Sequence, residues 1–161
     1  MKFIVDEMLG KLARWLRILG YDTECPVTPS DDELVRRSIA EDRLLLTRDT
    51  HLVENAVARR SLLVRSVHLE EQLAQVVSEL NLRCDRNLLF SRCLECNEKV
   101  IAVSHRQVRD EVPAYIYETQ TAFHKCPRCN KIYWRGTHWQ SLLSRLSSKD
   151  FTGFLEGPLI S

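Results

Sequence analysis

Long hydrophobic runs are missing from this chain of 161 residues, and no stretch approaches the roughly 20 apolar residues that a membrane-spanning helix needs. The first residues, MKFIVDEM, also lack the apolar region and small-residue cleavage site of a secretory signal peptide. We therefore expect a cytoplasmic protein with no membrane partner. No Pro-, Gly- or Ser-rich linker interrupts the chain, so we expect its parts to pack together.

A strong net charge is missing too. The formal charge is +1, which excludes the global basic field of many nucleic-acid-binding proteins. Residues 1–90 carry a net −2 and residues 91–161 a net +3. An acidic first part and a mildly basic second part suit a metal site followed by a phosphate-binding module, although chance explains so small an asymmetry equally well. The composition, 44% hydrophobic and 28% charged, is that of a soluble globular protein.

Short apolar strands alternate with amphipathic helices through the first 90 residues. The predicted strands are Lys2–Asp6, Tyr21–Cys25, Arg43–Thr47 and Leu62–Val67, and the predicted helices cover residues 9–19, Asp31–Glu41, Thr50–Arg60 and His68–Asn81. Gly20 is a natural stop for the first helix, and Ser30 with Glu33 forms a capping-box pattern before the second. Strands this apolar predict an α/β fold whose parallel sheet is covered by helices on both sides.

Cysteine is used in a specific pattern. The motif C-x-x-C-N occurs twice and supplies the four candidate ligands Cys93, Cys96, Cys126 and Cys129. Four thiolates form the tetrahedral set that zinc prefers, and a full shell makes the predicted Zn²⁺ structural rather than catalytic. The asparagine after each second cysteine suits a turn that needs a positive φ. A redox pair, a disulfide and an iron–sulfur site are the alternatives, but neither pair clearly opens a helix after a strand as a thioredoxin-like motif should.

The chain is predicted to divide near residue 90. Residues 1–90 form the α/β domain, and residues 91–161 form a zinc ribbon domain with a C-terminal helix. A further helix near Ser104–Glu111 accounts for the long spacing between the cysteine pairs. The remaining Cys25 and Cys84 are interpreted as small buried hydrophobic residues rather than ligands.

Acidic residues are predicted to gather at one edge of the sheet. Asp6 and Asp49 each end or follow a buried strand, and Asp31 and Asp32 open a helix that follows a strand. Carboxylates brought together at the C-terminal edge of a parallel sheet repel one another unless a cation is bound, and hard oxygen ligands suit Mg²⁺ or Mn²⁺. As alternatives, Asp31 and Asp32 could simply favour the helix N-terminus, and Asp49 could be a helix N-cap.

Basic residues near these acids are candidate substrate-binding groups. Lys11, Arg14 and Arg48 could hold a phosphate, although a solvated helix face is the commoner explanation for the first two. The ribbon also mixes cations with aromatic rings, as RNA-binding surfaces do. The residues concerned are Arg92, His124, Lys125, Arg128, Lys131, Tyr133, Trp134, Arg135, His138 and Trp139. Packing of Tyr133 and Trp139 against the first domain is the alternative.

Several segments together resemble the Mut-seven-C RNase family. They are FIVDEMLGKLARWLRILGYDT, DDELVRRSIAEDRLLLTRD, SRCLECN and VRDEVPAYIYETQTAFHKCPRCNKIYWRGTHW, in family order across nearly the whole chain. The resemblance implies a PIN-like three-layer fold followed by a zinc ribbon, and a ribonuclease that uses Mg²⁺ or Mn²⁺. It implies Asp6, Asp49 and either Asp31 or Asp32, of which we prefer Asp31, as the catalytic metal ligands. The fourth acid of many PIN nucleases has no unambiguous equivalent here.

The expected activity is hydrolysis of an RNA phosphodiester by an endonuclease, with the ribbon assisting RNA binding or stability. RNA is the expected partner, and ribosomal or RNA-processing partners are left open. One rival is a phospho-acceptor receiver domain, but that class needs a lysine at the end of a late strand, where residues 62–67 offer only Arg65. The other rival is a non-catalytic RNA- or protein-binding adaptor, which would bind without cleaving.

Overall fold

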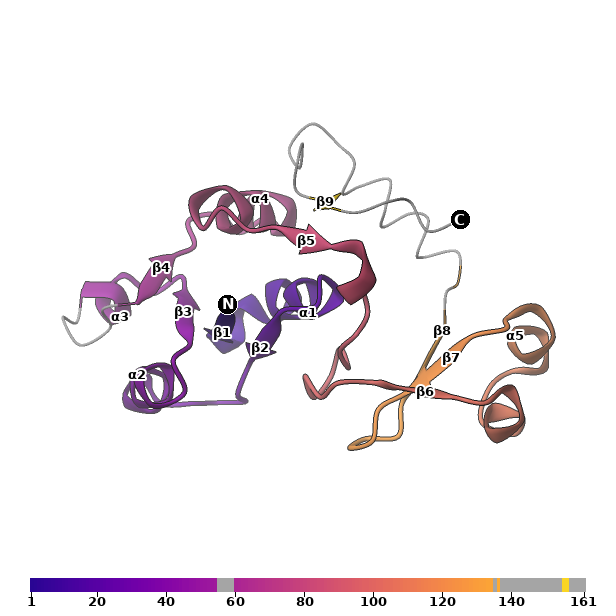
Figure 1. Ribbon diagram of the computed structural model, residues 1–161. Coiled ribbons are helices and arrows are strands. Elements are labelled where there is room, and N and C mark those ends of the chain that lie inside the picture. Colours follow the sequence, from indigo (N-terminus) through magenta and orange to yellow (C-terminus); the bar gives the residue numbers. More distant parts are fainter. Residues whose placement is uncertain (55–59, 135, 137–154, 157–161) are drawn as a thin grey trace.

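The structure is a computed structural model that describes residues 1–54, 60–134, 136 and 155–156. Its main element is a four-stranded parallel sheet in the order β2-β1-β3-β4, with helices between the strands (Figure 1). The strands are β1 (Lys2–Val5), β2 (Asp22–Glu24), β3 (Leu44–Thr47) and β4 (Ser61–Leu63), and the helices are α1 (Gly10–Ile18), α2 (Asp31–Ala40), α3 (Thr50–Glu54) and α4 (Leu69–Glu79). The predicted α/β fold with a parallel sheet is confirmed.

Both faces of the two central strands, β1 and β3, are buried, which explains why these strands show no polar alternation. On one face, Phe3, Val5 and Leu46 join a core built with α1 and α4. On the other face, Ile4 and Leu45 pack in a second, smaller cluster with residues of α2 and α3. Because successive strand residues point to opposite faces, each of these strands must be apolar throughout. The result is three layers, with the sheet in the middle.

The turn after α1 depends on a glycine. Gly20 has a φ of +89°, and a Cβ built there would lie 2.6 Å from the carbonyl oxygen of Leu88. The segment containing Leu88 lies against this turn, and the backbone N–H of Phe90 donates to the carbonyl of Ile18 at 2.8 Å. Gly20 therefore ends the helix, as predicted, and also lets the following part of the chain approach closely.

Residues after 90 form a second, antiparallel sheet of β6 (Ile101–Val103), β7 (Phe123–Lys125) and β8 (Ile132–Trp134). It lies beyond β2 and α1, away from α3 (Figure 1). The helix predicted near Ser104–Glu111 is present only as a short 3₁₀ helix, His105–Val108, with Ser104 as its N-cap. The α-helix of this segment, α5 (Ala114–Thr119), begins after Pro113. Proline disfavours helical backbone in the residue before it, so the two helices stay separate.

The end of the chain returns to the first part. β5 (Cys84–Asp85) pairs in parallel with β9 (Leu155–Glu156), a contact that the sequence did not predict. The predicted C-terminal helix lies outside the described residues, as does the segment 55–59 of the predicted helix Thr50–Arg60. Among the described residues, no helix combines the length and apolar character that crossing a bilayer requires.

Candidate functional site

Two of the predicted acids follow neighbouring strands where the strand order of the sheet reverses. The strands β1 and β3 are neighbours, and the connection after β1 leads to β2 on one side whereas the connection after β3 leads to β4 on the other. Asp6 directly follows β1, and Asp49 lies two residues beyond β3. Ligand sites of open parallel sheets lie at such a reversal, outside the carboxyl ends of the strands.

Thr47 links the two acids. Its hydroxyl donates to Oδ2 of Asp6 at 3.0 Å and accepts the backbone N–H of Asp49 at 3.0 Å. Thr47 is fully buried, so its hydroxyl is held in one orientation between the two strand ends. Sequence reasoning missed this residue, although the available signal was the hydroxyl two positions before Asp49 in the T-R-D motif.

Asp49 also caps a helix. Its Oδ1 accepts the backbone N–H of His51 at 2.8 Å, within the first turn of α3. The alternative interpretation of Asp49 as an N-cap is therefore correct for one carboxylate oxygen. Because Asp6 likewise commits one oxygen to Thr47, each carboxylate has a second oxygen with which to bind a cation. Mg²⁺ is often held by one or two carboxylates together with waters and substrate phosphates, so this pair fits such an ion.

The third predicted acid stands apart from this pair. Asp31 and Asp32 are exposed at the start of α2, where Ser30 caps the helix by accepting the N–H of Glu33. Among the described residues, the four cysteines form the one group of three or more potential ligands that lie close enough together to share an ion. Within the described part of the chain, Asp6 and Asp49 thus share Thr47 as a hydrogen-bond partner, and neither Asp31 nor Asp32 joins them in a group of three ligands.

The three candidate phosphate-binding cations differ in their surroundings. Arg14 forms an ion pair with Glu95 of the ribbon, with its Nη2 at 2.9 Å from Oε2. Lys11 is exposed one turn earlier on the same helix. Arg48, beside Asp49, has a buried Nε for which the described part of the chain supplies no hydrogen-bond partner. Lys11 and Arg48 therefore present charge near the acids, whereas Arg14 contacts the ribbon.

The four motif cysteines form a compact cluster. Their Sγ atoms all lie within 4.8 Å of one another, with 3.5 Å between Cys93 and Cys129 and 3.3 Å between Cys96 and Cys126. A tetrahedron of Zn–S bonds of about 2.3 Å has edges of about 3.8 Å, so the cluster has nearly the size that zinc requires. The four cysteines could therefore bind a zinc ion, as predicted.

Each cysteine pair sits on the same kind of turn. The backbone N–H of Cys93 donates to Glu98 and that of Asn97 donates to Cys93, and the second pair repeats this pattern at Cys126 and Asn130. Asn97 and Asn130 have φ values of 63° and 62°. The expectation that asparagine supplies the positive φ of these turns is confirmed.

Electrostatics within the cluster favour a cation. Burial raises the pKa of Cys93, but the Tyr133 hydroxyl and nearby backbone N–H groups outweigh it and lower that pKa to about 6. Burial and the neighbouring Cys126 thiol raise the pKa of Cys96 to about 12. The Cys93 thiol therefore loses its proton readily, whereas the Cys96 thiol resists deprotonation. A divalent ion overcomes this resistance because it stabilises every thiolate that binds it.

The two remaining cysteines lie outside this cluster. Cys84 is 1% exposed, and burial raises its pKa to about 12, so it is a small core residue as predicted. Cys25 is partly buried and packs against the same core.

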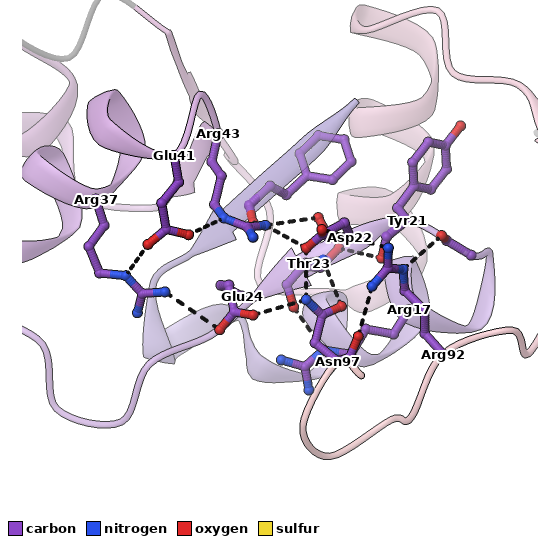
Figure 2. Close-up of polar contacts among 12 residues, drawn as sticks. Arg17, Tyr21, Asp22, Thr23, Glu24, Arg37, Glu41, Arg43, Arg92 and Asn97 are labelled. Atoms are coloured by element: carbon purple, nitrogen blue, oxygen red, sulfur yellow. Dashed lines mark hydrogen bonds and ion pairs between the residues drawn. The ribbon is translucent and has the colours of Figure 1, made fainter. Parts of the chain in front are cut away.

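The first cysteine turn, residues 93–97, docks onto the free edge of β2 (Figure 2). The side-chain oxygen of Asn97 accepts the N–H of Thr23 at 2.9 Å, and its amide donates to Asp22 and Glu24. Arg17, only 5% exposed, donates to the carbonyls of Thr23, Leu94 and Glu95. The turn thereby satisfies backbone groups that an edge strand otherwise leaves unpaired.

Charged side chains extend this docking region. Arg43 donates to Asp22 at 2.6 Å and to Glu41 at 2.6 Å (Figure 2). Burial raises the pKa of Asp22, but hydrogen bonds from Arg43 and Asn97 outweigh it, and the pKa lies below its usual 3.8. Asp22 is therefore ionised at neutral pH. Sequence reasoning did not single out Arg17, Asp22 or Arg43, because their partners lie far away along the chain.

Some of the ribbon residues proposed for RNA contact bond to other residues of the protein, whereas others are exposed. Tyr133 is structural, since its hydroxyl lies 3.1 Å from the Sγ of Cys93 and accepts the N–H of Leu94. Lys125 pairs with Glu111 and Lys131 with Glu95, while Arg92 contacts Asp22. His124, Arg128 and Trp134 are exposed. Arg135, His138 and Trp139 lie outside the described residues.

Fold and site define a three-layer α/β protein with two acids, Asp6 and Asp49, at the switch point of its sheet and a four-cysteine ribbon. The chain belongs to the family described as the Mut7-C RNAse domain, whose model matches residues 1–146. The family match covers both the sheet and the ribbon. Searches of curated proteins and of solved structures found no match.

Proposed function

We propose that the protein is a divalent-metal-dependent ribonuclease that cleaves RNA internally. The observation that carries the proposal is the placement of Asp6 and Asp49 after neighbouring strands at the switch point of the sheet, where the Thr47 hydroxyl bonds both the Asp6 carboxylate and the Asp49 backbone N–H. Membership of the Mut7-C RNAse domain family supports RNA as the substrate. Neither observation depends on the other.

The free oxygens of Asp6 and Asp49 would hold Mg²⁺ or Mn²⁺. When bound, such an ion activates water and offsets the charge that develops during displacement at phosphorus. Thr47 is a positioning residue that fixes Asp6 relative to Asp49. Arg48 and Lys11 would bind the phosphate. The products are a 5′-phosphate and a 3′-hydroxyl.

The cysteine cluster would hold a structural Zn²⁺. All four ligands come from the protein, so no position is open to substrate. Its first turn supports β2 through Asn97 and accepts hydrogen bonds from Arg17, and β2 is the immediate neighbour of the strand that precedes Asp6. The ribbon thus stabilises the nuclease part, and its exposed His124, Arg128 and Trp134 assist RNA binding.

Incubation with a panel of RNAs tests this function. Zinc-loaded protein is mixed with single-stranded, hairpin and duplex RNAs in Mn²⁺, in Mg²⁺, and with neither ion present. We expect cleavage with either ion, none without them, and internal cuts that leave 5′-phosphates. RNA binding without cleavage under every condition would instead identify the non-catalytic adaptor. Cleavage that persists without Mn²⁺ or Mg²⁺ would contradict the metal-dependent mechanism.

A further inference from the structure

A groove lies at the edge of the sheet where Asp6 and Asp49 follow their strands. It is open, has a volume of about 570 Å³, and runs between the start of α1 and the start of α4. These two helices pack together on one face of the sheet (Figure 1). The groove is lined by Glu7, Met8, Leu9, Gly10, Lys11, Val67, His68, Leu69 and Gln72. We call it the α1–α4 groove.

The groove begins next to the paired acids. Its first lining residue, Glu7, directly follows Asp6 along the chain. Its two walls follow β1 and β4, the strands on either side of β3, and Asp49 follows β3. A strand of nucleic acid with one phosphate at the acids would therefore enter this groove with its neighbouring nucleotide.

The lining combines a lysine and a histidine side chain with exposed apolar side chains. Among the described residues, neither the Lys11 ammonium nor the His68 ring has a hydrogen-bond or ion-pair partner, in contrast to Arg14 one turn later. Met8 is 65% exposed and Val67 is 63% exposed, so both present large apolar surfaces to solvent. Cations beside apolar surface suit an RNA strand, because phosphates need charge and bases need a surface to lie against.

We propose that the α1–α4 groove binds the single-stranded RNA nucleotide adjacent to the cleaved phosphate. Lys11 contacts the flanking phosphate, His68 lies within reach of the same strand, and the base rests against Met8 and Val67. This site extends the proposed ribonuclease function and names its substrate as unpaired RNA. The two are tested separately by measuring binding and cleavage independently.

Gly10 provides a way to block the groove without disturbing the fold. It lines the groove, and a Cβ built there meets nothing within 4 Å. Its backbone is right-handed helical, with φ −55° and ψ −33°, so any L-residue other than proline can adopt it. Phenylalanine also has a better helix propensity than glycine. The variant Gly10→Phe should therefore fold and place its ring in the groove.

The experiment measures fluorescence anisotropy of a labelled single-stranded RNA with full-length, zinc-loaded Asp49→Asn protein, which removes cleavage from the binding measurement. We expect Gly10→Phe in this background to raise Kd about tenfold. Lys11→Ala should raise Kd several-fold and reduce the slope of log Kd against log salt by about 0.7, the value for one single-strand phosphate contact. Ala40→Phe, which adds a ring to the exposed surface of α2, should leave Kd unchanged.

Cleavage by the same groove variants with Asp49 intact completes the test. If Gly10→Phe weakens both binding and cleavage about tenfold with unchanged unfolding temperature and zinc content, the groove is the RNA site. Binding that depends on the groove in a protein that never cleaves RNA supports the groove and rejects the nuclease. Unchanged binding and cleavage by Gly10→Phe overturns the groove proposal alone and assigns the groove to another ligand, such as a protein segment.

Discussion

Asp49→Asn is expected to reduce RNA cleavage at least a thousandfold while the folded protein remains as stable as the wild type. Cleavage falls because an amide cannot supply the negative oxygen that a hard divalent ion requires. Stability is kept because asparagine caps helices as well as aspartate does, so the hydrogen bond from the His51 N–H to Oδ1 survives. Single-turnover cleavage and urea unfolding measure the two effects.

Matched variants make this result specific. Asp110→Asn makes the same carboxylate-to-amide change at an exposed acid of the ribbon, and this variant should cleave RNA at the wild-type rate. Asp31→Asn and Asp32→Asn, compared side by side, identify which of the two acids contributes. Full metal-dependent activity in Asp49→Asn would remove Asp49 from the site, and a loss of activity that follows a loss of stability would assign it a structural role.

Zinc removal is expected to destabilise the whole protein rather than the ribbon alone. The first cysteine turn accepts two hydrogen bonds from the buried Arg17 and holds Asn97 against β2. Without the ion this turn loses its fixed conformation, and the buried Arg17 guanidinium loses the two carbonyls to which it donates. The free energy of unfolding then falls by about 3 kcal/mol or more. For a protein of this size, the unfolding temperature should fall by roughly 10 °C. Calorimetry before and after chelation, with zinc added back, measures the change.

The two turns provide an internal control. Asn97 and Asn130 share the same positive φ, but hydrogen bonds from the side chain to other residues are found within the described chain only for Asn97. Glycine tolerates the backbone conformation at both positions. Asn97→Gly should therefore lower the free energy of unfolding by about 2 kcal/mol, and Asn130→Gly by much less. Equal effects would mean that docking of the first turn contributes nothing to stability.

Much of the fold could be predicted because its signals are local. Short apolar runs identified the two central strands, β1 and β3, and the two C-x-x-C-N motifs identified the cluster. The capping of α2 by Ser30 also followed from neighbouring residues. Around Ser104–Glu111 the sequence predicted a helix, but only the short 3₁₀ helix His105–Val108 forms there, and α5 after Pro113 was not predicted.

The parts that could not be predicted depend on distant contacts. Arg17 and Asn97 look like ordinary helix and turn residues until the fold brings them together across β2. Thr47 becomes significant only because β1 and β3 are neighbours. The same limit applies to Arg14, whose ion pair with Glu95 joins residues that are 81 positions apart.

The most direct test is to locate the ion. Crystals of the zinc-loaded protein soaked in Mn²⁺ are measured at the manganese absorption edge, with Asp49→Asn crystals as the control. We expect an anomalous peak within ligand distance of both Asp6 and Asp49, which is absent from the variant. Manganese bound elsewhere, or not bound at all with RNA present, would contradict a shared metal site at this edge of the sheet.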